Sequence, residues 1–321
     1  MTVTCRLYRD GRVAEETLEP AGVSAVLEDP GVLVWLDISA PTEAEVSMLG
    51  EEFGFHELAL EDSLHPHQRP KVDQYDRYFF LVAYGVEVME GAAVEREMAA
   101  FVSERFLVTV RKDPALDLSE AVKRWDAHPE QVRQGGGFLL YAVLDEIVDG
   151  YFVAIDALEE LTEDVEEQVL APTEGRDATA DIFRLKKELL GLRRAVAPLR
   201  DVLDVMQRRT IPVVTPDLEP YYRDVYDHVL RATDFIDNLR DIMSNALDAH
   251  LAAVSNRLNE VMKVLTSIAT VLLVLTVVTG FFGQNWSFIP YGSLPLFWIS
   301  MGVTALIAVG LVTYFHRRGW L

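Results

Sequence analysis

The feature that most constrains this chain is a stretch of 52 residues without a charged side chain, from Val264 to Phe315. A polar, proline-bearing segment divides it into two apolar runs, Val264–Gly283 and Leu294–Phe315. A helix needs about 20 apolar residues to cross a hydrocarbon core ~30 Å thick, and a helix in a soluble core is usually shorter. The sequence therefore predicts two transmembrane helices joined by a short loop, residues 284–293.

Basic residues flank both predicted spans. Arg257 and Lys263 precede the first span, and Arg317 and Arg318 follow the second in a short tail, residues 316–321. Basic flanks favour the cytoplasmic side of a membrane. We therefore expect a multi-pass protein of the cell membrane with two transmembrane helices, both termini in the cytoplasm and the loop outside.

Acidic residues are confined to the part of the chain before the membrane. The formal net charge is -22, yet residues 262–321 hold no acid and three bases, so the preceding 261 residues carry 26 bases against 51 acids. Such a surface lacks the basic footprint that nucleic acids require, and cations are its natural partners. Because no nucleophile–base pairing or zinc-protease spacing stands out, we expect no enzyme.

Residues 1–135 are predicted to form an α/β domain. A hairpin is expected around an Asp10-Gly11 turn, and Thr42 with Glu45 forms a capping box that starts a helix. The expected strands are Thr2–Tyr8, Arg12–Thr17, Val32–Ile38, Tyr78–Val88, Met98–Ser103 and Phe106–Arg111. The pattern indicates a compact domain on the cytosolic side.

Helical patterns follow over residues 136–216. We interpret the glycine-rich segment Gln134–Gly137 as a helix boundary, because the Lys-Ser/Thr pair of a phosphate-binding loop does not follow it. The acidic stretch from Asp156 to Glu167 is either a solvated helix face or a further cation site.

One very long helix is predicted next. Between Tyr221 and Thr279 there is neither glycine nor proline, so a helix of 59 residues, about 90 Å long, can run from the cytosol into the membrane. We therefore expect residues 217–283 to form a stalk helix that continues into the first span, and residues 294–315 to form the second span.

A stripe of small and polar residues follows one face of that helix, since residues seven apart share a face in supercoiled helices. One series is Asp248, Ser255, Met262, Ala269, Thr276 and Gly283, and the series beside it is Ala252, Asn259, Thr266, Leu273 and Gly280. Small residues alone would indicate close helix packing. The polar members favour a water-lined axis built by several copies, because one chain with two spans cannot enclose a pore.

Several segments resemble one family of membrane proteins. Gly283-Gln284-Asn285, at the outer end of the first span, resembles the Gly-Met-Asn signature of the CorA magnesium transporter family. The resemblance extends over Tyr222–His228, Val254–Asn256 and Asn259–Thr266, and over Leu60–Asp62 and His67–Val72. The last segment also favours a structural role for His65 and His67 over a transition-metal site.

The resemblance implies a homopentamer that encloses an ion channel. Each subunit would contribute an α+β cytosolic funnel domain, a long stalk helix that lines the pore, and a second span that surrounds it and meets membrane lipid. The outer ring, Gly283, Gln284 and Asn285, would receive a hydrated divalent cation through carbonyl and carboxamide oxygens. Because Mg2+ gives up its water reluctantly, oxygen dipoles are a suitable first contact.

The same resemblance implies roles along the pore and between subunits. Asn259 would be a polar ring, Asp248 an acidic ring on the cytosolic side, Thr276 a further pore-facing position, and Met262, Leu265 and Leu273 hydrophobic constrictions. Asp224 of one subunit would bind a regulatory cytosolic Mg2+ together with Glu61 and Asp62 of the next, and so hold the pore shut.

Gln284 departs from the family signature, which has methionine at this position. The expected function is passive, potential-driven uptake of Mg2+, with Co2+ or Ni2+ as further ions. Gln284 leaves open a ZntB-type zinc transporter of the same superfamily, which could be coupled to protons, and a membrane-anchored cation sensor that does not conduct. The outer loop also contains no acidic residue.

Overall fold

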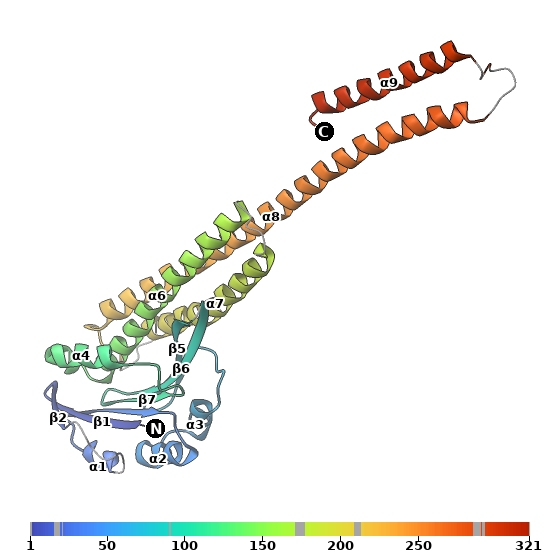
Figure 1. The fold of residues 1–321 in the computed structure, drawn as a ribbon. Helices are drawn as coiled ribbons and strands as arrows, with labels where there is room; N and C mark the ends of the chain where they lie inside the picture. The colour runs from blue at the N-terminus through green and yellow to red at the C-terminus, as the bar shows by residue number, and fades with distance from the viewer. Residues whose placement is uncertain are drawn as a thin grey trace. The chain divides into compact units, whose positions relative to one another are not determined.

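The computed structural model describes residues 2–15, 20, 22–89, 91–170, 177–208, 213–284, 290 and 293–320. The chain forms two compact units, Met1–Ala246 and Leu247–Leu321. Figure 1 shows the elements of both along the chain. The helix α8 (Glu219–Phe282) belongs to both units.

The first unit is built on a seven-stranded mixed sheet with the order β2-β1-β3-β7-β6-β5-β4. The pair β3 and β7 is parallel, and the other neighbours are antiparallel. The strands are β1 (Thr2–Arg9), β2 (Arg12–Glu15), β3 (Val32–Ser39), β4 (Lys71–Gln74), β5 (Phe79–Met89), β6 (Ala92–Val102) and β7 (Phe106–Arg111). All eight residues of β3 are buried, because helices cover both faces of the sheet.

Most of the expected strands are confirmed, with small shifts at their ends. Asp10 and Gly11 both have positive φ, 54° and 77°, as a tight hairpin turn between β1 and β2 requires. The strand β6 begins at Ala92, six residues before its expected start. The expected end of β2 at Thr17 lies outside the described residues. The short strand β4 was not expected.

Short helices on one side of the sheet are α1 (Val23–Val26), α2 (Glu43–Phe53) and α3 (Glu57–Leu64), and the figure places them opposite α6. The capping box expected at α2 is present. The Thr42 hydroxyl accepts from the Glu45 N–H at 3.3 Å, and the Glu45 carboxylate accepts from the Thr42 N–H at 2.8 Å. These two bonds fix where α2 begins.

Helices on the other side are α4 (Ser119–Ala127), α6 (Gly136–Leu170) and α7 (Ala178–Arg208). The short helix α5 (Pro129–Val132) lies between α4 and α6 in the chain. The glycine-rich segment is the boundary between α5 and α6, as expected. A Cβ atom at Gly136 would lie only 2.2 Å from the Ser103 carbonyl oxygen, and one at Gly137 only 2.0 Å from that of Val213. Glycine therefore lets α6 start in direct contact with two loops.

The part of α8 that belongs to the first unit packs through a regular apolar stripe. Its buried residues recur at alternating intervals of three and four: Tyr222, Val225, Val229, Ala232, Ile236, Leu239, Met243 and Ala246. Polar contacts along the edge tie α8 to α7, such as the Arg193 Nε bond to Asp237 Oδ1 at 2.7 Å and the Lys186 Nζ bond to Ser244 Oγ at 2.9 Å. The alternation of three and four between the buried residues of α8 is typical of helices that pack as a coiled coil.

The second unit consists of the remainder of α8 and of α9 (Leu294–Arg317). Both helices are long and apolar enough to cross a membrane, and most of their apolar side chains are exposed within the single chain. The Ser293 hydroxyl caps α9 by accepting from the Leu296 N–H at 3.4 Å. At the other end of α9, the Trp320 ring stacks on Phe315.

Candidate functional site

Asp224 and His228 lie on α8, one turn apart, at the edge of its buried stripe. Their neighbours Tyr222, Val225 and Val229 are fully buried. The polar pair therefore faces the boundary between the helix contact and solvent, where the Asp224 side chain is 61% exposed.

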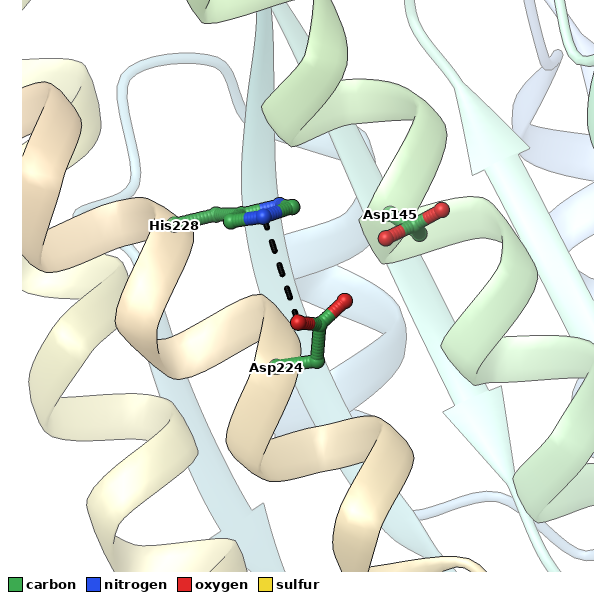
Figure 2. Close-up of side chains that lie close together, drawn as sticks. All are labelled: Asp145, Asp224 and His228. Atoms are coloured by element: carbon green, nitrogen blue, oxygen red, sulfur yellow. Dashed lines mark ion pairs between the residues drawn. The ribbon is translucent and has the colours of Figure 1, made fainter.

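Asp145 of α6 completes a cluster with this pair. The possible ligand atoms of Asp145, Asp224 and His228 all lie within 4.8 Å of one another, and His228 Nε2 is 4.0 Å from Asp224 Oδ1. Figure 2 shows the three side chains converging from the two helices. His228 also contacts the Phe152 ring edge to face, and its buried Nδ1 atom has no hydrogen-bond partner. We call these three residues the carboxylate–histidine cluster.

Further charged groups surround the cluster. Arg124 of α4 forms an ion pair with Asp145 and lies over the Tyr141 ring at 6.0 Å. Burial raises the pKa of Asp149, and the neighbouring Asp145 carboxylate raises it further. Burial, together with Asp145, raises the pKa of Tyr141 to about 12. Negative charge is therefore concentrated here beyond what one arginine neutralises.

The donor set fits a divalent cation. Two carboxylates supply the oxygen ligands that Mg2+ prefers, with water completing the octahedron. An imidazole nitrogen adds a ligand suited to Co2+, Ni2+ or Zn2+. The cluster can thus hold a hard cation through Asp145 and Asp224, or a transition metal through all three side chains.

Glu61 and Asp62 lie in the last turn of α3 and are not part of this cluster. Asp62 Oδ2 accepts from Lys71 Nζ at 2.6 Å, and Lys71 also pairs with Asp73 at 2.9 Å. Glu61 is exposed. Their expected pairing with Asp224 crosses a subunit boundary and stays a prediction.

The loop after α3 is held by a buried ion pair. Glu97 Oε1 accepts from Lys112 Nζ at 2.5 Å, and Glu97 Oε2 accepts from the His67 N–H at 2.7 Å. Lys112 also reaches the carbonyl oxygens of Asp62 and His65. Among the described residues, neither His65 nor His67 joins a group of metal-ligating side chains, which favours the structural role expected for this loop.

The residues expected to line a pore are exposed on one side of α8 in the second unit. At about 100° per residue they share roughly one third of the helix circumference. The set is Asp248, Asn259, Met262, Leu265, Leu273 and Thr276. A groove of about 340 Å³ between α8 and α9 is lined from α8 by Val278, Thr279 and Phe282, which project from the opposite side. In this set, which we call the pore stripe, Leu273 and Thr276 face away from the groove with α9, whereas Asn259 and Met262 line a second hollow together with Trp320, which follows α9.

The Gly-x-Asn motif begins where α8 ends. The Gly283 N–H bonds to the Thr279 carbonyl at 3.0 Å, and the Gln284 N–H bonds to the Phe281 carbonyl at 3.3 Å. Asn285 lies outside the described residues. The structure therefore describes two of the three motif residues, at the end of the first predicted span.

Comparison with known proteins identifies the family. The family model of the CorA-like Mg2+ transporter protein matches residues 30–317. The chain belongs to the CorA family. It is 34% identical over 306 residues to the cobalt/magnesium transport protein CorA of Thermotoga maritima. This match covers 91% of this chain and 85% of the relative. The resemblance inferred from the motifs is therefore confirmed.

Two solved structures share the whole fold, and a third shares most of it. The complete CorA structure from Methanocaldococcus jannaschii covers 100% of both chains with a TM-score of 0.80 and 24% identity. The full-length CmaX protein covers 99% of this chain with a TM-score of 0.77. The cytoplasmic domain of ZntB from Vibrio parahaemolyticus has a TM-score of 0.61 at 14% identity. An α/β domain, a long helix and two apolar C-terminal helices are thus the CorA fold.

Sequence reasoning found Asp224 but gave no role to Asp145 or His228. A signal existed for His228, because it follows Asp224 by four residues and so shares its helix face. Asp145 was harder to find, since it lies 79 positions away and only the contact of α6 with α8 brings it near. Of the acidic stretch in α6, Asp156, Glu159, Glu160, Glu163, Asp164 and Glu167 are exposed.

Proposed function

We propose that this CorA chain is one subunit of a homopentameric channel in the cell membrane for passive uptake of Mg2+, with Co2+ and Ni2+ as further ions. The observation that carries the proposal is the pore stripe on α8, which is exposed in the single chain and whose members Leu273 and Thr276 face away from the groove between α8 and α9. Five such stripes would line one axis, while α9 would lie outside them and meet lipid. The name of the Thermotoga maritima relative, a cobalt/magnesium transport protein, supports the choice of ions.

The driving force is the membrane potential. A divalent ion that enters a cell at -100 mV gains roughly 4.6 kcal/mol, from ~2.3 kcal/mol per elementary charge per 100 mV. Both termini are proposed to be cytoplasmic, so the ion would meet the motif ring of Gly283, Gln284 and Asn285 first. It would then pass Thr276 and the apolar rings Leu273, Leu265 and Met262, and leave past Asn259 and Asp248.

The regulatory part of the proposal places a cytosolic divalent ion at the carboxylate–histidine cluster. Asp224 and Asp145 would bind it within one subunit, and Glu61 and Asp62 of a neighbouring subunit would complete its ligands. The support is the geometry of three convergent ligand groups and the 61% exposure of the Asp224 side chain, which would leave it accessible to a second subunit. Carboxylates crowded at such an interface repel one another until a hard cation bridges them.

Flux into liposomes tests the transport proposal. The purified chain is reconstituted, and uptake of Mg2+, Co2+ and Zn2+ is compared with and without an imposed inside-negative potential. We expect Mg2+ uptake that rises with the potential and falls when Mg2+ is present inside. Binding of Mg2+ without flux of any cation would instead identify a membrane-anchored sensor.

A zinc transporter is the second candidate, and Gln284 is the observation that favours it. Gln284 replaces the methionine of the family signature at the outer end of α8. Zn2+ flux without Mg2+ flux in the same liposomes, particularly if it requires a proton gradient, would establish this candidate and exclude the first.

A further inference from the structure

Arg124 occupies one of the ligands of the carboxylate–histidine cluster. It projects from α4 and pairs with Asp145, whose side chain is only 9% exposed, while the Arg124 side chain is 32% exposed. The guanidinium also lies 6.0 Å above the Tyr141 ring. A guanidinium keeps its charge at every physiological pH, so this positive group is permanent.

A bound divalent ion and Arg124 would compete for the same carboxylate. The ion needs the oxygens of Asp145 and Asp224, which lie with His228 within 4.8 Å of one another. Two cations close to one carboxylate repel each other, and the burial of Asp145 reduces the solvent that screens this repulsion. Arg124 must therefore be displaced, or share Asp145 at a cost in affinity.

The surroundings permit such a displacement without unfolding α4. The Ala121 N–H donates to Glu146 of α6 at 2.5 Å, so a second bond still holds α4 on α6. Trp125 next to Arg124 is fully buried and anchors the same helix turn. Only the Arg124 side chain needs to move.

We propose that Arg124 is a built-in counter-ion that occupies Asp145 until a divalent cation replaces it, and that it thereby sets the cation concentration at which the cluster fills. The inference rests on the proposed regulatory role of the cluster. The inference predicts the direction in which cation affinity changes when Arg124 is removed. Loss of a competing counter-ion tightens cation binding, whereas loss of a purely structural ion pair would weaken it.

The test measures MgCl2 binding to the purified full-length chain by isothermal titration calorimetry. Arg124→Gln is compared with the wild-type chain and with Lys123→Gln, which removes the same charge from the same helix. Lys123 is a suitable control because its side chain is 69% exposed and it pairs only at the surface with Glu120. We expect Arg124→Gln to lower the Kd about fivefold, in the range of a partly exposed charge pair, and Lys123→Gln to change it less than about twofold.

Asp224→Ala separates failure of this inference from failure of the proposed site. If Asp224→Ala removes the binding event but Arg124→Gln leaves the Kd unchanged or raises it, the counter-ion role is wrong and the site stands. If Asp224→Ala leaves the isotherm unchanged, both are wrong. If the Arg124→Gln chain does not fold or assemble, Arg124→Lys is used instead. The lysine ammonium matches the Asp145 carboxylate less well than a guanidinium does, so the Kd for Mg2+ should fall about twofold. An equal or higher Kd overturns the inference.

Discussion

The hydroxyl of Tyr222 on α8 donates a hydrogen bond to the carbonyl oxygen of Gly137 at the start of α6, at 2.9 Å. Tyr222 is fully buried, and Gly137 has no side chain to hold the helices apart. From this pair both helices run in the same direction, so Asp145, eight residues beyond Gly137, comes opposite Asp224 and His228. The bond thus fixes the register that assembles the carboxylate–histidine cluster.

Removal of that hydroxyl is expected to destabilise the chain. Tyr222→Phe keeps the ring but loses a buried hydrogen bond, which lowers the free energy of unfolding by about 1 kcal/mol. The measurement is the Tm of the purified chain in detergent. Tyr226→Phe, one turn later and half-exposed, is the matched control and should leave the Tm nearly unchanged. Equal shifts in both variants would contradict the role given to the bond.

A second contact predicts how stability depends on pH. Asp237 of α8 accepts from Arg193 of α7 and from Arg240, at 2.7 and 2.6 Å, and the Arg193 bond is the main cause of its lowered pKa. A carboxylate with a lowered folded pKa stabilises the fold above its unfolded pKa, about 3.9, and the benefit is lost as the pH falls through the folded value.

Asp237→Asn should therefore lower the Tm at neutral pH and lose its effect in acid. Because Asp237 and Arg193 are both about two-fifths exposed, the expected loss is only about 0.5 kcal/mol. The Tm difference from the wild-type chain should be constant well above the unfolded pKa and shrink as the pH falls through the lowered folded pKa. Asp241→Asn, at an exposed position one turn later, is the control. A difference that persists in acid would show that ionisation is not its cause.

The sequence was sufficient for the parts of the fold that local rules determine. The absence of charged residues over 264–315 predicted both apolar helices. The lack of glycine and proline between Tyr221 and Thr279 predicted α8 almost to its ends. The capping box at Thr42 and the turn at Asp10-Gly11 were equally local. In each case the pattern depends on neighbours in the chain, which a sequence displays directly.

Contacts between distant segments were not predictable in the same way. The ion pair between Arg124 and Asp145 joins two helices through their packing, and no spacing rule connects these residues. The role of Lys112 is similar, since its contacts with Glu97 and the Asp62 carbonyl depend on the end of β7 lying beside α3. Asp62 was identified from a family motif, but its ion pair with Lys71 could be seen only in the fold.

Loss of Asp224 should weaken closure by internal Mg2+. Asp224→Ala removes the exposed carboxylate of the cluster, so higher internal Mg2+ is needed to stop uptake, while assembly is kept. The measurement is the internal Mg2+ concentration that halves flux into liposomes. Asp227→Ala is the control, because Asp227 is also exposed on the same helix turn but is not in the cluster. An unchanged midpoint in Asp224→Ala would count against the regulatory site.

Two substitutions in the motif test its role as a filter. Asn285→Ala removes a carboxamide from the proposed outer ring and should abolish selective Mg2+ uptake. Gln284→Met restores the signature of the family and should keep Mg2+ uptake while reducing any Zn2+ uptake. Both are measured by competition between the two ions in liposome flux. Normal selectivity in Asn285→Ala would contradict the filter.

Cysteine substitution can determine which face of α8 meets the ion path. Cys5 is the only cysteine in the sequence, and its burial raises the pKa of its thiol to about 12, so its reactive thiolate is scarce. The native chain should therefore react little with a positively charged methanethiosulfonate reagent that is added outside. Thr276→Cys places a thiol on the pore stripe, where modification should add fixed positive charge to the ion path and block flux.

Val278→Cys is the matched control for this experiment. Val278 is two residues away on α8, but it lines the groove shared with α9 and so faces away from the stripe. A thiol there should react slowly with a charged reagent, because the site is apolar, and any modification should leave flux unchanged. Block at Val278→Cys with none at Thr276→Cys would reverse the assignment, since the face of α8 towards α9 would then carry the ions.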